Sequence, residues 1–244
     1  MSFSWGRVGA IVRKELRDYR RNRFVLVFTM AVLPLLFIIL PMVQLFTIPE
    51  VAATTVLDRR IGLSLLYLLL IPAIVPSALA AYTVVGEREQ GTLEPILTTP
   101  LRSEEFLVGK ALAALIPTLI IAYAMLAIFY IGAAIVAHPA VSSAVFQRSH
   151  VLVQLVFTPL LAAWSIWVGI AISTRMSDVR AAQQLGVFAS LPPLAIVALM
   201  GLNVITPSPA LALGLAAALL AVDVLGWRAV AGMFNRERLI AGRR

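Results

Sequence analysis

The sequence predicts an all-α membrane protein in which six transmembrane helices follow one amphipathic helix. Of its 244 residues, 61% are hydrophobic and only 13% are charged, about half the charged share of an ordinary soluble domain. Apolar windows of about 20 residues recur six times, and each is long enough to cross a hydrocarbon core of about 30 Å. Backbone groups in lipid must form hydrogen bonds within the protein, which only α-helices and closed β-barrels allow. Because the windows lack the strict alternation of β-barrel strands, we expect them to be helices.

We expect the six spans to form a single transmembrane domain over residues 1–244. We expect them at about 24–46, 61–85, 106–137, 151–174, 183–203 and 209–227.

Residues 3–23 are expected to form an amphipathic helix that lies along the membrane surface. At about 100° per residue, the apolar side chains from Trp5 to Tyr19 gather within an arc of about 140°, with the basic side chains opposite. A basic face and an aromatic-bearing apolar stripe are typical of an interfacial helix. Glu15 interrupts this stripe. Two explanations remain open: its carboxylate reaches solvent or pairs with an arginine, or it contacts a partner subunit.

The basic residues are unevenly distributed along the chain, whose formal net charge is +8. With the N-terminus in the cytoplasm, 17 of the 20 fall on the cytoplasmic side, and only Arg59, Arg60 and Arg148 fall outside. This asymmetry follows the positive-inside rule and places both termini in the cytoplasm. The expected partner of these basic residues is therefore the anionic lipid surface rather than nucleic acid. Only Lys14 and Lys110 are lysines, and this preference for arginine, with abundant alanine, is typical of a GC-rich bacterial genome. The expected location is therefore the cytoplasmic (inner) membrane of a bacterium.

Two local features predict where helices begin and bend. Ser103 is expected to cap the third span, with acidic residues following in its first turn. The adjacent Pro192 and Pro193 fall in the middle of the fifth span. Because each proline removes a backbone hydrogen bond, we expect that helix to be broken or strongly kinked there.

The sequence holds no constellation that predicts catalysis or a resident cofactor. Cysteine is absent, and His138 and His150 have no third metal ligand nearby. The Gly109–Lys110 pair lacks the earlier glycine and the following Ser or Thr of a phosphate-binding loop. We therefore expect no enzyme activity, no cofactor and no metal in this chain.

Asp223 is the acidic residue that falls inside an apolar window. It precedes Arg228 by five residues, about 7.5 Å along a helix, which places it near the cytoplasmic rim. Reaching solvent, or pairing with Arg180 or Arg228, is the favoured role. A functional role for a carboxylate in the membrane is the alternative.

A charged island at residues 84–110 separates the second and third spans. Glu87 and Glu89 lie near the C-terminal end of the second helix, where the helix dipole disfavours anions. Thr92 to Thr98 fit a short helix whose leucine and isoleucine side chains would form a small exposed patch. Such patches, rimmed by charge, mark protein contacts. We interpret the island as a docking surface; the alternative is an ordinary loop whose apolar side rests on lipid.

This island closely resembles the loop after the second span of ABC-2 type transporter permeases. The similarity lies in GEREQGTLE at 86–94, in Pro100, and in FLVGK at 106–110. Part of the leader, Lys14-Glu15-Leu16 and the basic run at 20–23, is also similar to that family. The resemblance implies the fold of an ABC-2, type V exporter.

The resemblance further implies a permease that dimerises, as a homodimer or heterodimer, and couples to two cytoplasmic ATP-binding-cassette ATPase subunits. ATP and Mg would bind those subunits, and the second and fifth helices would line the path. The coupling helix would lie within a loop of residues 86–105. The residues implied in ATPase coupling are Glu87, Arg88, Glu89, Gln90, Gly91, Thr92, Leu93, Glu94, Pro95, Ile96, Leu97 and Thr98. Those implied in a secondary ATPase contact are Arg175, Asp178, Arg180 and Glu15.

Together these inferences predict the permease subunit of an ATP-driven exporter that works by alternating access. The uncharged spans favour a hydrophobic or amphipathic substrate such as a drug, a lipid or a peptide. Two alternatives stay open: a non-transporting scaffold or sensor coupled to an ATPase, and a six-span membrane enzyme.

Overall fold

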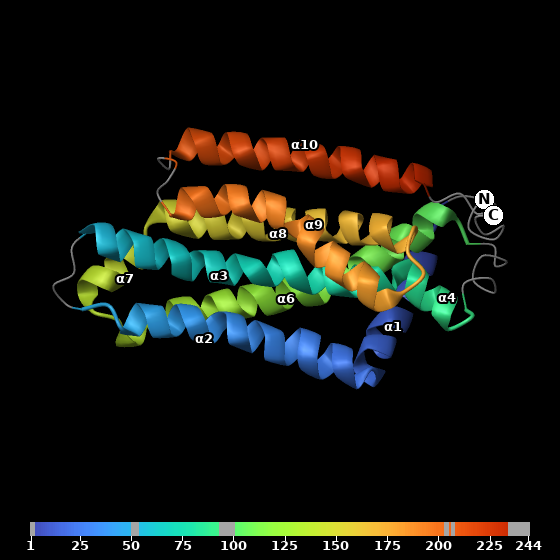
Figure 1. The fold of residues 1–244 in the computed structure, drawn as a ribbon, viewed down its shortest axis with the longest axis horizontal. Coiled ribbons are helices and arrows are strands. Elements are labelled where there is room, and N and C mark those ends of the chain that lie inside the picture. The colour runs from blue at the N-terminus through green and yellow to red at the C-terminus, as the bar shows by residue number, and fades with distance from the viewer. Residues whose placement is uncertain (1–2, 50–53, 93–100, 203–204, 206–207, 234–244) are drawn as a thin grey trace.

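The computed structural model describes residues 3–49, 54–92, 101–202, 205 and 208–233, and every regular element within these ranges is a helix. Six stretches are long and apolar enough to cross a membrane, which confirms the predicted number of spans. They run side by side in one elongated bundle (Figure 1). The elements are α1 (Trp5–Arg21), η1 (Phe24–Val32), α2 (Leu33–Phe46), α3 (Thr54–Ala81), η2 (Tyr82–Gly86), α4 (Glu87–Glu89), α6 (Ser103–Val136), α7 (Pro139–Val145), α8 (Arg148–Ser173), α9 (Val179–Gly201) and α10 (Pro209–Met233), where η marks a π-helix.

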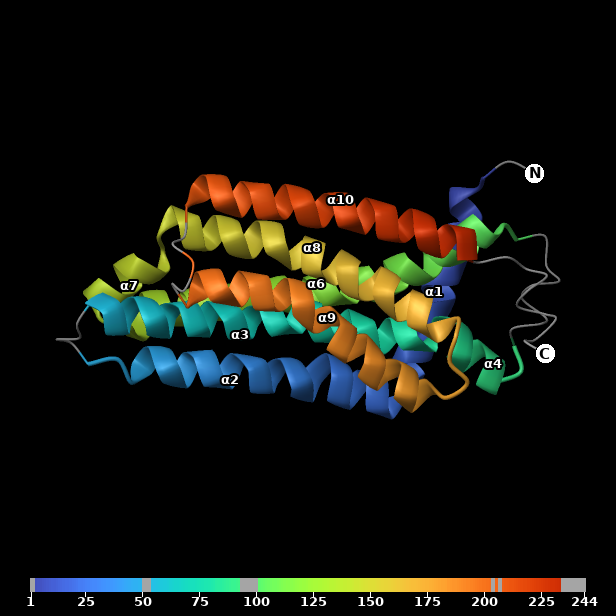
Figure 2. The ribbon, with the colours of Figure 1, turned by 45° about the horizontal axis from the view of Figure 1, so that its top comes forward.

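The leader helix α1 runs crosswise to the spans at one end of the bundle (Figures 1 and 2). We call this end the α1 end. The apolar stripe of α1 packs on α6: Val8 and Tyr19 are buried, and Ile11 lies so close to Gly109 that a Cβ atom there would be 2.8 Å away. Trp5 is 69% exposed. The stripe predicted to face lipid is thus used largely to hold α1 to the third span.

Helix α3 is the centre of the bundle. About two thirds of its apolar window is buried, and it packs against α2, α6, α8 and α9. The approach of α8 is close because Gly169 faces Ala80 and the backbone of Ser77. Small residues at such contacts let membrane helices approach to van der Waals distance.

Polar side chains of α8 also bind the backbone of α3 along its length. Because each acceptor is a main-chain carbonyl in an apolar interior, these bonds fix the relative height of the two helices. The pairs are Gln154 Nε2 with the Leu65 carbonyl at 2.8 Å, Ser165 Oγ with Ala73 at 2.7 Å, and Ser173 Oγ with Ala81 at 2.7 Å.

One prediction about a helix end needs correction, and one about a bend is narrowed to one of its two alternatives. The N-cap of α6 is Arg102, whose amide donates to the Glu105 carboxylate, and Ser103 is already the first helical residue. Helix α9 was expected to be broken or strongly kinked at Pro192 and Pro193, and it is one helix from Val179 to Gly201. It changes direction part-way along its length (Figures 1 and 2), so the prolines bend it without interrupting it.

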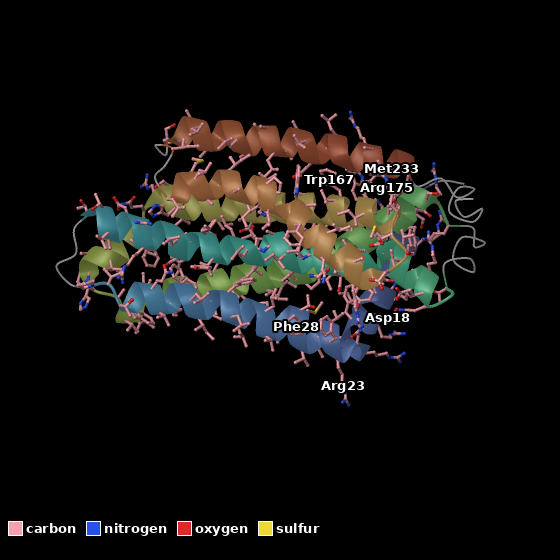
Figure 3. All side chains as sticks on the ribbon, in the orientation of Figure 1. Asp18, Arg23, Phe28, Trp167, Arg175 and Met233 are labelled. Atoms are coloured by element: carbon pink, nitrogen blue, oxygen red, sulfur yellow. The ribbon has the colours of Figure 1, made fainter. Side chains whose placement is uncertain are left out.

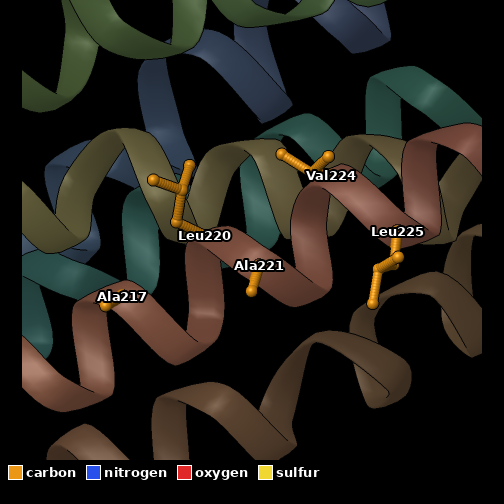
Figure 4. Close-up of a pocket in the computed structure, with 5 residues that line it drawn as sticks. All are labelled: Ala217, Leu220, Ala221, Val224 and Leu225. Carbon is orange, nitrogen blue, oxygen red and sulfur yellow. The ribbon is translucent and has the colours of Figure 1, made fainter.

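Helices α2 and α10 form opposite edges of the bundle (Figures 1 and 2). Only 17% of the apolar window of α10 is buried, and the helix packs mainly on α8. A shallow hollow on it is lined by Ala217, Leu220, Ala221, Val224 and Leu225, all from α10 itself (Figure 4). These residues offer no polar side chain, so the hollow is not a candidate for catalysis.

Candidate coupling site

The second span ends in an ordered turn at the α1 end. After η2 and α4, Gly91 adopts φ = +67°, a conformation that glycine reaches without steric cost. The Gly91 amide donates to the Arg88 carbonyl at 3.1 Å, and the Thr92 amide donates to the Glu87 carbonyl at 2.9 Å. This pair of bonds is the Schellman motif that stops a helix. The chain therefore leaves the second span in a fixed direction.

Four charged residues from three elements meet beside this turn and form what we call the charge cluster: Lys14, Glu15, Glu87 and Lys110. Lys110 Nζ lies 2.9 Å from Glu15 Oε1 and 2.5 Å from Glu87 Oε1. Lys14 Nζ lies 3.0 Å and 2.7 Å from the same two oxygens. Glu15, Glu87 and Lys110 are each at most 5% exposed. The two lysines of the chain thus balance two buried carboxylates.

Further groups complete the charge cluster. The Thr92 hydroxyl donates to Glu87 Oε2, and Asp18 lies 3.4 Å from Lys14 Nζ. Figure 3 shows Asp18 on α1. Burial by itself would lower the pKa of Lys14, but its hydrogen bond to Glu87 and the charge of Glu15 raise that pKa above its ordinary value. Lys14 therefore stays charged at neutral pH.

A second ionic contact fastens the beginning of α1 to the beginning of α6. The Glu105 side chain is fully buried and accepts hydrogen bonds from Arg7 Nε at 2.8 Å and Nη2 at 2.6 Å. It also accepts from the amides of Ser4 at 2.7 Å and Arg102 at 3.0 Å. Such multiple charge-assisted bonds are the strong class of hydrogen bond. Helix α1 is thus held at two points along α6.

The next residues of the island contact the loop between α8 and α9. Glu89 Oε1 accepts the amide of Val179, the first residue of α9, at 3.1 Å. Arg88 Nη1 donates to the Met176 carbonyl at 3.3 Å. An anion at a helix N-terminus is stabilised by the helix dipole. Glu89 is therefore well placed for α9, although it is badly placed for the helix that carries it.

These contacts revise the interpretation of the island's acids. We expected the helix dipole to disfavour Glu87 and Glu89, and the resemblance implied both in ATPase coupling. Instead the lysines of the charge cluster neutralise Glu87, and the N-terminus of α9 receives Glu89. Glu15 pairs within the chain as well, with lysine rather than arginine. All three acids thus have partners inside this chain.

The remaining predicted coupling residues divide into two groups. Gln90 and Gly91 are exposed at the tip of the turn, and Thr92 is half-buried. The rest of the predicted coupling helix lies outside the described residues: Leu93, Glu94, Pro95, Ile96, Leu97 and Thr98.

The predicted secondary contact lies at the same end of the bundle. Asp178 caps α9, because its Oδ1 accepts the Ala181 amide at 2.7 Å. Arg180 is exposed in the first turn of α9. Arg175 lies beside Met233 at the end of α10 (Figure 3), with its Nη2 3.9 Å from the sulfur. The structure thus brings the first and second loops of this end together.

Within the part of the chain that the structure describes, Asp223 pairs with neither Arg180 nor Arg228. It is 6% exposed on α10, and its Oδ1 accepts Trp167 Nε1 at 3.0 Å. Figure 3 shows Trp167 between α8 and α10. The other oxygen, Oδ2, is buried and has no hydrogen-bond partner among the described residues. The described residues also hold no group of three or more ligands that could bind a metal.

Several residues of this site were missed in the sequence. Lys110 and Glu105 were placed at the start of a span without partners, and Ser173 was one serine among many. The signal available for the lysines was their rarity, since the chain has two lysines and eighteen arginines. Lys110 and Glu87 are 23 residues apart in the sequence, and several other pairs are about 70 to 100 residues apart, so no local pattern reveals them.

A comparison with known protein families identifies the family of this chain. The sequence profile of the ABC-2 type transporter family matches residues 7–206. The chain belongs to this family. The match covers α1 and the first five spans, and therefore both the charge cluster and the loops that Glu89 joins. No curated protein matches the chain.

Family membership establishes the general role of the permease. ABC-2 proteins are the membrane component of a transporter, and this one is a multi-pass membrane protein with six apolar spans. Its family associates with an ATP-binding-cassette ATPase, and the membrane component is generally not the catalytic one.

Proposed function

We propose that this permease is the membrane half of an ATP-driven exporter that moves a hydrophobic or amphipathic substrate out of a bacterial cell. The observation that carries the proposal is the ordered base of the loop after the second span. Glu87, 3% exposed, and the turn at Gly91 fix the direction in which the chain leaves the bundle. A loop that transmits the movement of an ATPase to the membrane helices needs such a rigid base, because a flexible base would change conformation without displacing the helices.

The ATPase contact is formed by the exposed part of this loop. Gln90 and Gly91 are exposed, and the segment from Thr92 to Thr98 follows them directly. In this proposal Glu87 and Glu15 hold the loop, and the residues beyond them enter a groove of the ATPase. ATP and Mg bind that partner, and the permease supplies no catalytic group.

The permease works as a dimer, with α3 and α9 near the path between the copies. Phe188 of α9 is 68% exposed, and Leu185 on the same helix is 46% exposed. Since exposed apolar side chains on a span face either lipid or another subunit, α9 offers an apolar surface that a second copy of the permease could contact.

A single cysteine at Phe188 in this cysteine-free chain should give a cross-linked dimer under oxidising conditions, whereas one at the outer face of α10, at Leu213, should not.

The orientation follows from charge. Arg17, Arg20, Arg21 and Arg23 are exposed around the start of the first span, and Figure 3 shows Arg23 pointing away from the bundle. Anionic headgroups of the cytoplasmic leaflet attract such a cluster by about 1 kcal/mol per basic residue. This attraction supports a cytoplasmic location for the α1 end and both termini.

The test is the charge reversal Glu94→Lys. We expect the variant to insert and fold normally but to lose an ATPase that co-purifies with the wild type, or to lose ATP-driven transport. Glu104→Lys, an exposed acid in the first turn of α6, is the matched control. Unchanged ATPase binding and transport in the Glu94 variant would remove the coupling helix from this proposal.

A second experiment separates an exporter from a scaffold. In reconstituted vesicles, an exporter should show substrate-stimulated ATP hydrolysis, and substrate should accumulate inside inverted vesicles.

A further inference from the structure

We infer that the base of the first loop and the start of α9 move as one body, joined by a set of contacts that we name the loop clasp. The loop clasp consists of Ser173, Arg88 and Glu89 with their backbone partners. It would make α9 follow any movement that the ATPase imposes on the loop. This inference rests on the proposed function, and it identifies which residues carry the movement onward.

Ser173 anchors the loop clasp to the end of α8, which the short loop at 174–178 connects to α9. It is fully buried at the end of α8, and its hydroxyl oxygen accepts two amides of η2, from Val84 at 3.0 Å and Val85 at 3.1 Å. The same hydroxyl donates to the Ala81 carbonyl at 2.7 Å. One side chain thus supplies three hydrogen bonds to a distorted turn of the second span. Polar groups inserted into a helix ladder in this way stabilise a π-helical turn.

Glu89 and Arg88 extend the loop clasp toward α9. Glu89 receives the Val179 amide, and Arg88 donates to the Met176 carbonyl, as described above. One bond ends within the short loop between α8 and α9, and the other ends at the first residue of α9. Any rotation of α4 must therefore break them or carry the N-terminus of α9 with it.

An apolar contact backs these hydrogen bonds. Ala81 and Val85 of the second span pack with Val179 and Ala182 of α9, and all four are at most 6% exposed. Because close-packed interiors are not continuously deformable, this contact resists sliding. Hydrogen bonds and packing together couple the two segments more tightly than either would alone.

The decisive variant is Ser173→Ala, with Ser165→Ala as its control. Both serines are fully buried on α8 and donate to a carbonyl of the second span. Only Ser173 also accepts amides of that span. In the isolated permease, hydrogen exchange at Val84 and Val85 should become about two- to tenfold faster in the Ser173 variant, the factor for losing an ordinary hydrogen bond. The Ser165 variant should leave these two amides unchanged.

The functional measurement uses a reporter at the far end of α9. A single cysteine at Leu199, which is 40% exposed, is labelled with maleimide in the complex with the co-purified ATPase. In the wild type, ATP with Mg and vanadate should change the labelling rate. Ser173→Ala should retain ATPase binding and ATP hydrolysis but reduce that change by about two- to tenfold.

Val179→Pro provides an independent second variant in case Ser173→Ala fails to fold. Proline is tolerated at the first position of a helix, and the preceding Asp178 is already extended (φ −121°, ψ 129°) as proline requires. The substitution removes the amide that Glu89 accepts. It should give the same loss of nucleotide-dependent labelling with ATP hydrolysis preserved.

Each result has a definite meaning. Unchanged exchange at Val84 and Val85, or an unchanged labelling response in both variants, overturns the loop clasp. Loss of ATPase binding in both variants also overturns it, because the residues would then act in docking. If the wild type binds no ATPase, the proposed function is refuted, and the inference that rests on it is refuted as well.

Discussion

The charge cluster at the α1 end and Asp223 on α10 both bury carboxylates, but they differ in the partners that they provide. In the charge cluster, Glu15 and Glu87 each lie within 3.0 Å of two lysine ammonium groups. Asp223 has one neutral donor, Trp167, and an oxygen with no partner among the described residues. A fully paired cluster fixes the geometry of the elements that supply it, whereas a singly bonded acid does not. We therefore expect substitutions in the charge cluster to lower the free energy of unfolding more than a substitution of Asp223.

Lys110→Met should have the largest effect. It leaves Glu15 and Glu87 buried with only the half-exposed Lys14, and removing one member of a buried ionic group costs about 3–5 kcal/mol. Denaturant unfolding in mixed micelles measures this loss of the free energy of unfolding. Arg17→Met, at an exposed position of α1, should change it by less than about 0.5 kcal/mol. A loss below about 1 kcal/mol in the Lys110 variant would mean that the charge cluster does not organise this end.

Glu105→Ala should come next, at about 2–3 kcal/mol, because the charged acceptor of four donors is removed. Since Glu105 joins the beginning of α1 to α6, the variant should also free that part of α1. Trypsin should cleave after Arg7 and Arg13 faster than in the wild type. Glu104→Ala, which removes an exposed neighbouring acid, serves as the control and should leave the cleavage rate unchanged.

Lys14→Met should cost less, about 1 kcal/mol, because the Lys14 side chain is 45% exposed and solvent screens its pairs. Its pKa is raised in the folded protein. The stabilisation is therefore complete below the unfolded value of about 10.4 and is lost only as the pH rises through the folded pKa. The stability difference between wild type and variant should stay constant from pH 6 to pH 9. A difference that shrinks within this range would contradict the raised pKa.

Asp223→Asn should have the smallest effect, within about 1 kcal/mol of the wild type. The amide keeps an oxygen for Trp167 Nε1, and it is neutral at a buried position where the described residues supply no cationic partner. Thermal unfolding measured by tryptophan fluorescence reports the change. A loss above about 2 kcal/mol would show that Asp223 is ionised and paired in the assembled transporter, and would restore the functional interpretation of this acid.

The same comparison separates what sequence reasoning can and cannot predict. The six spans were predictable because the length and apolarity of each are local properties. The importance of the island was predictable too, although for a reason that the structure corrects. Glu89 appeared unfavourable because only its own helix was considered, and the N-terminus that stabilises it belongs to a helix 90 residues further along the chain.

The partners of the charge cluster could not be predicted for a related reason. Lys110 was treated as part of an apolar span, and Lys14 as one of many basic residues on α1. Their convergence on Glu87 depends on α1 turning across the end of the bundle rather than lying free on the lipid. That packing includes the close contact of Ile11 with Gly109, and the sequence pattern of each residue does not reveal that the two meet.

The π-helical turn η2 has a consequence for how this protein tolerates changes in length. A π-helical turn contains one residue more than an α-helical turn, so Tyr82–Gly86 acts as an insertion of one residue into the second span. If the same residues formed a regular α-helix instead, everything after them would be rotated by about 100°, the angle of one residue. Glu87 would then turn away from both lysines, and Glu89 would leave the start of α9. Deleting one residue within this segment should instead remove the π-helical turn and leave that orientation nearly unchanged, so the turn sets the angular register of the whole loop.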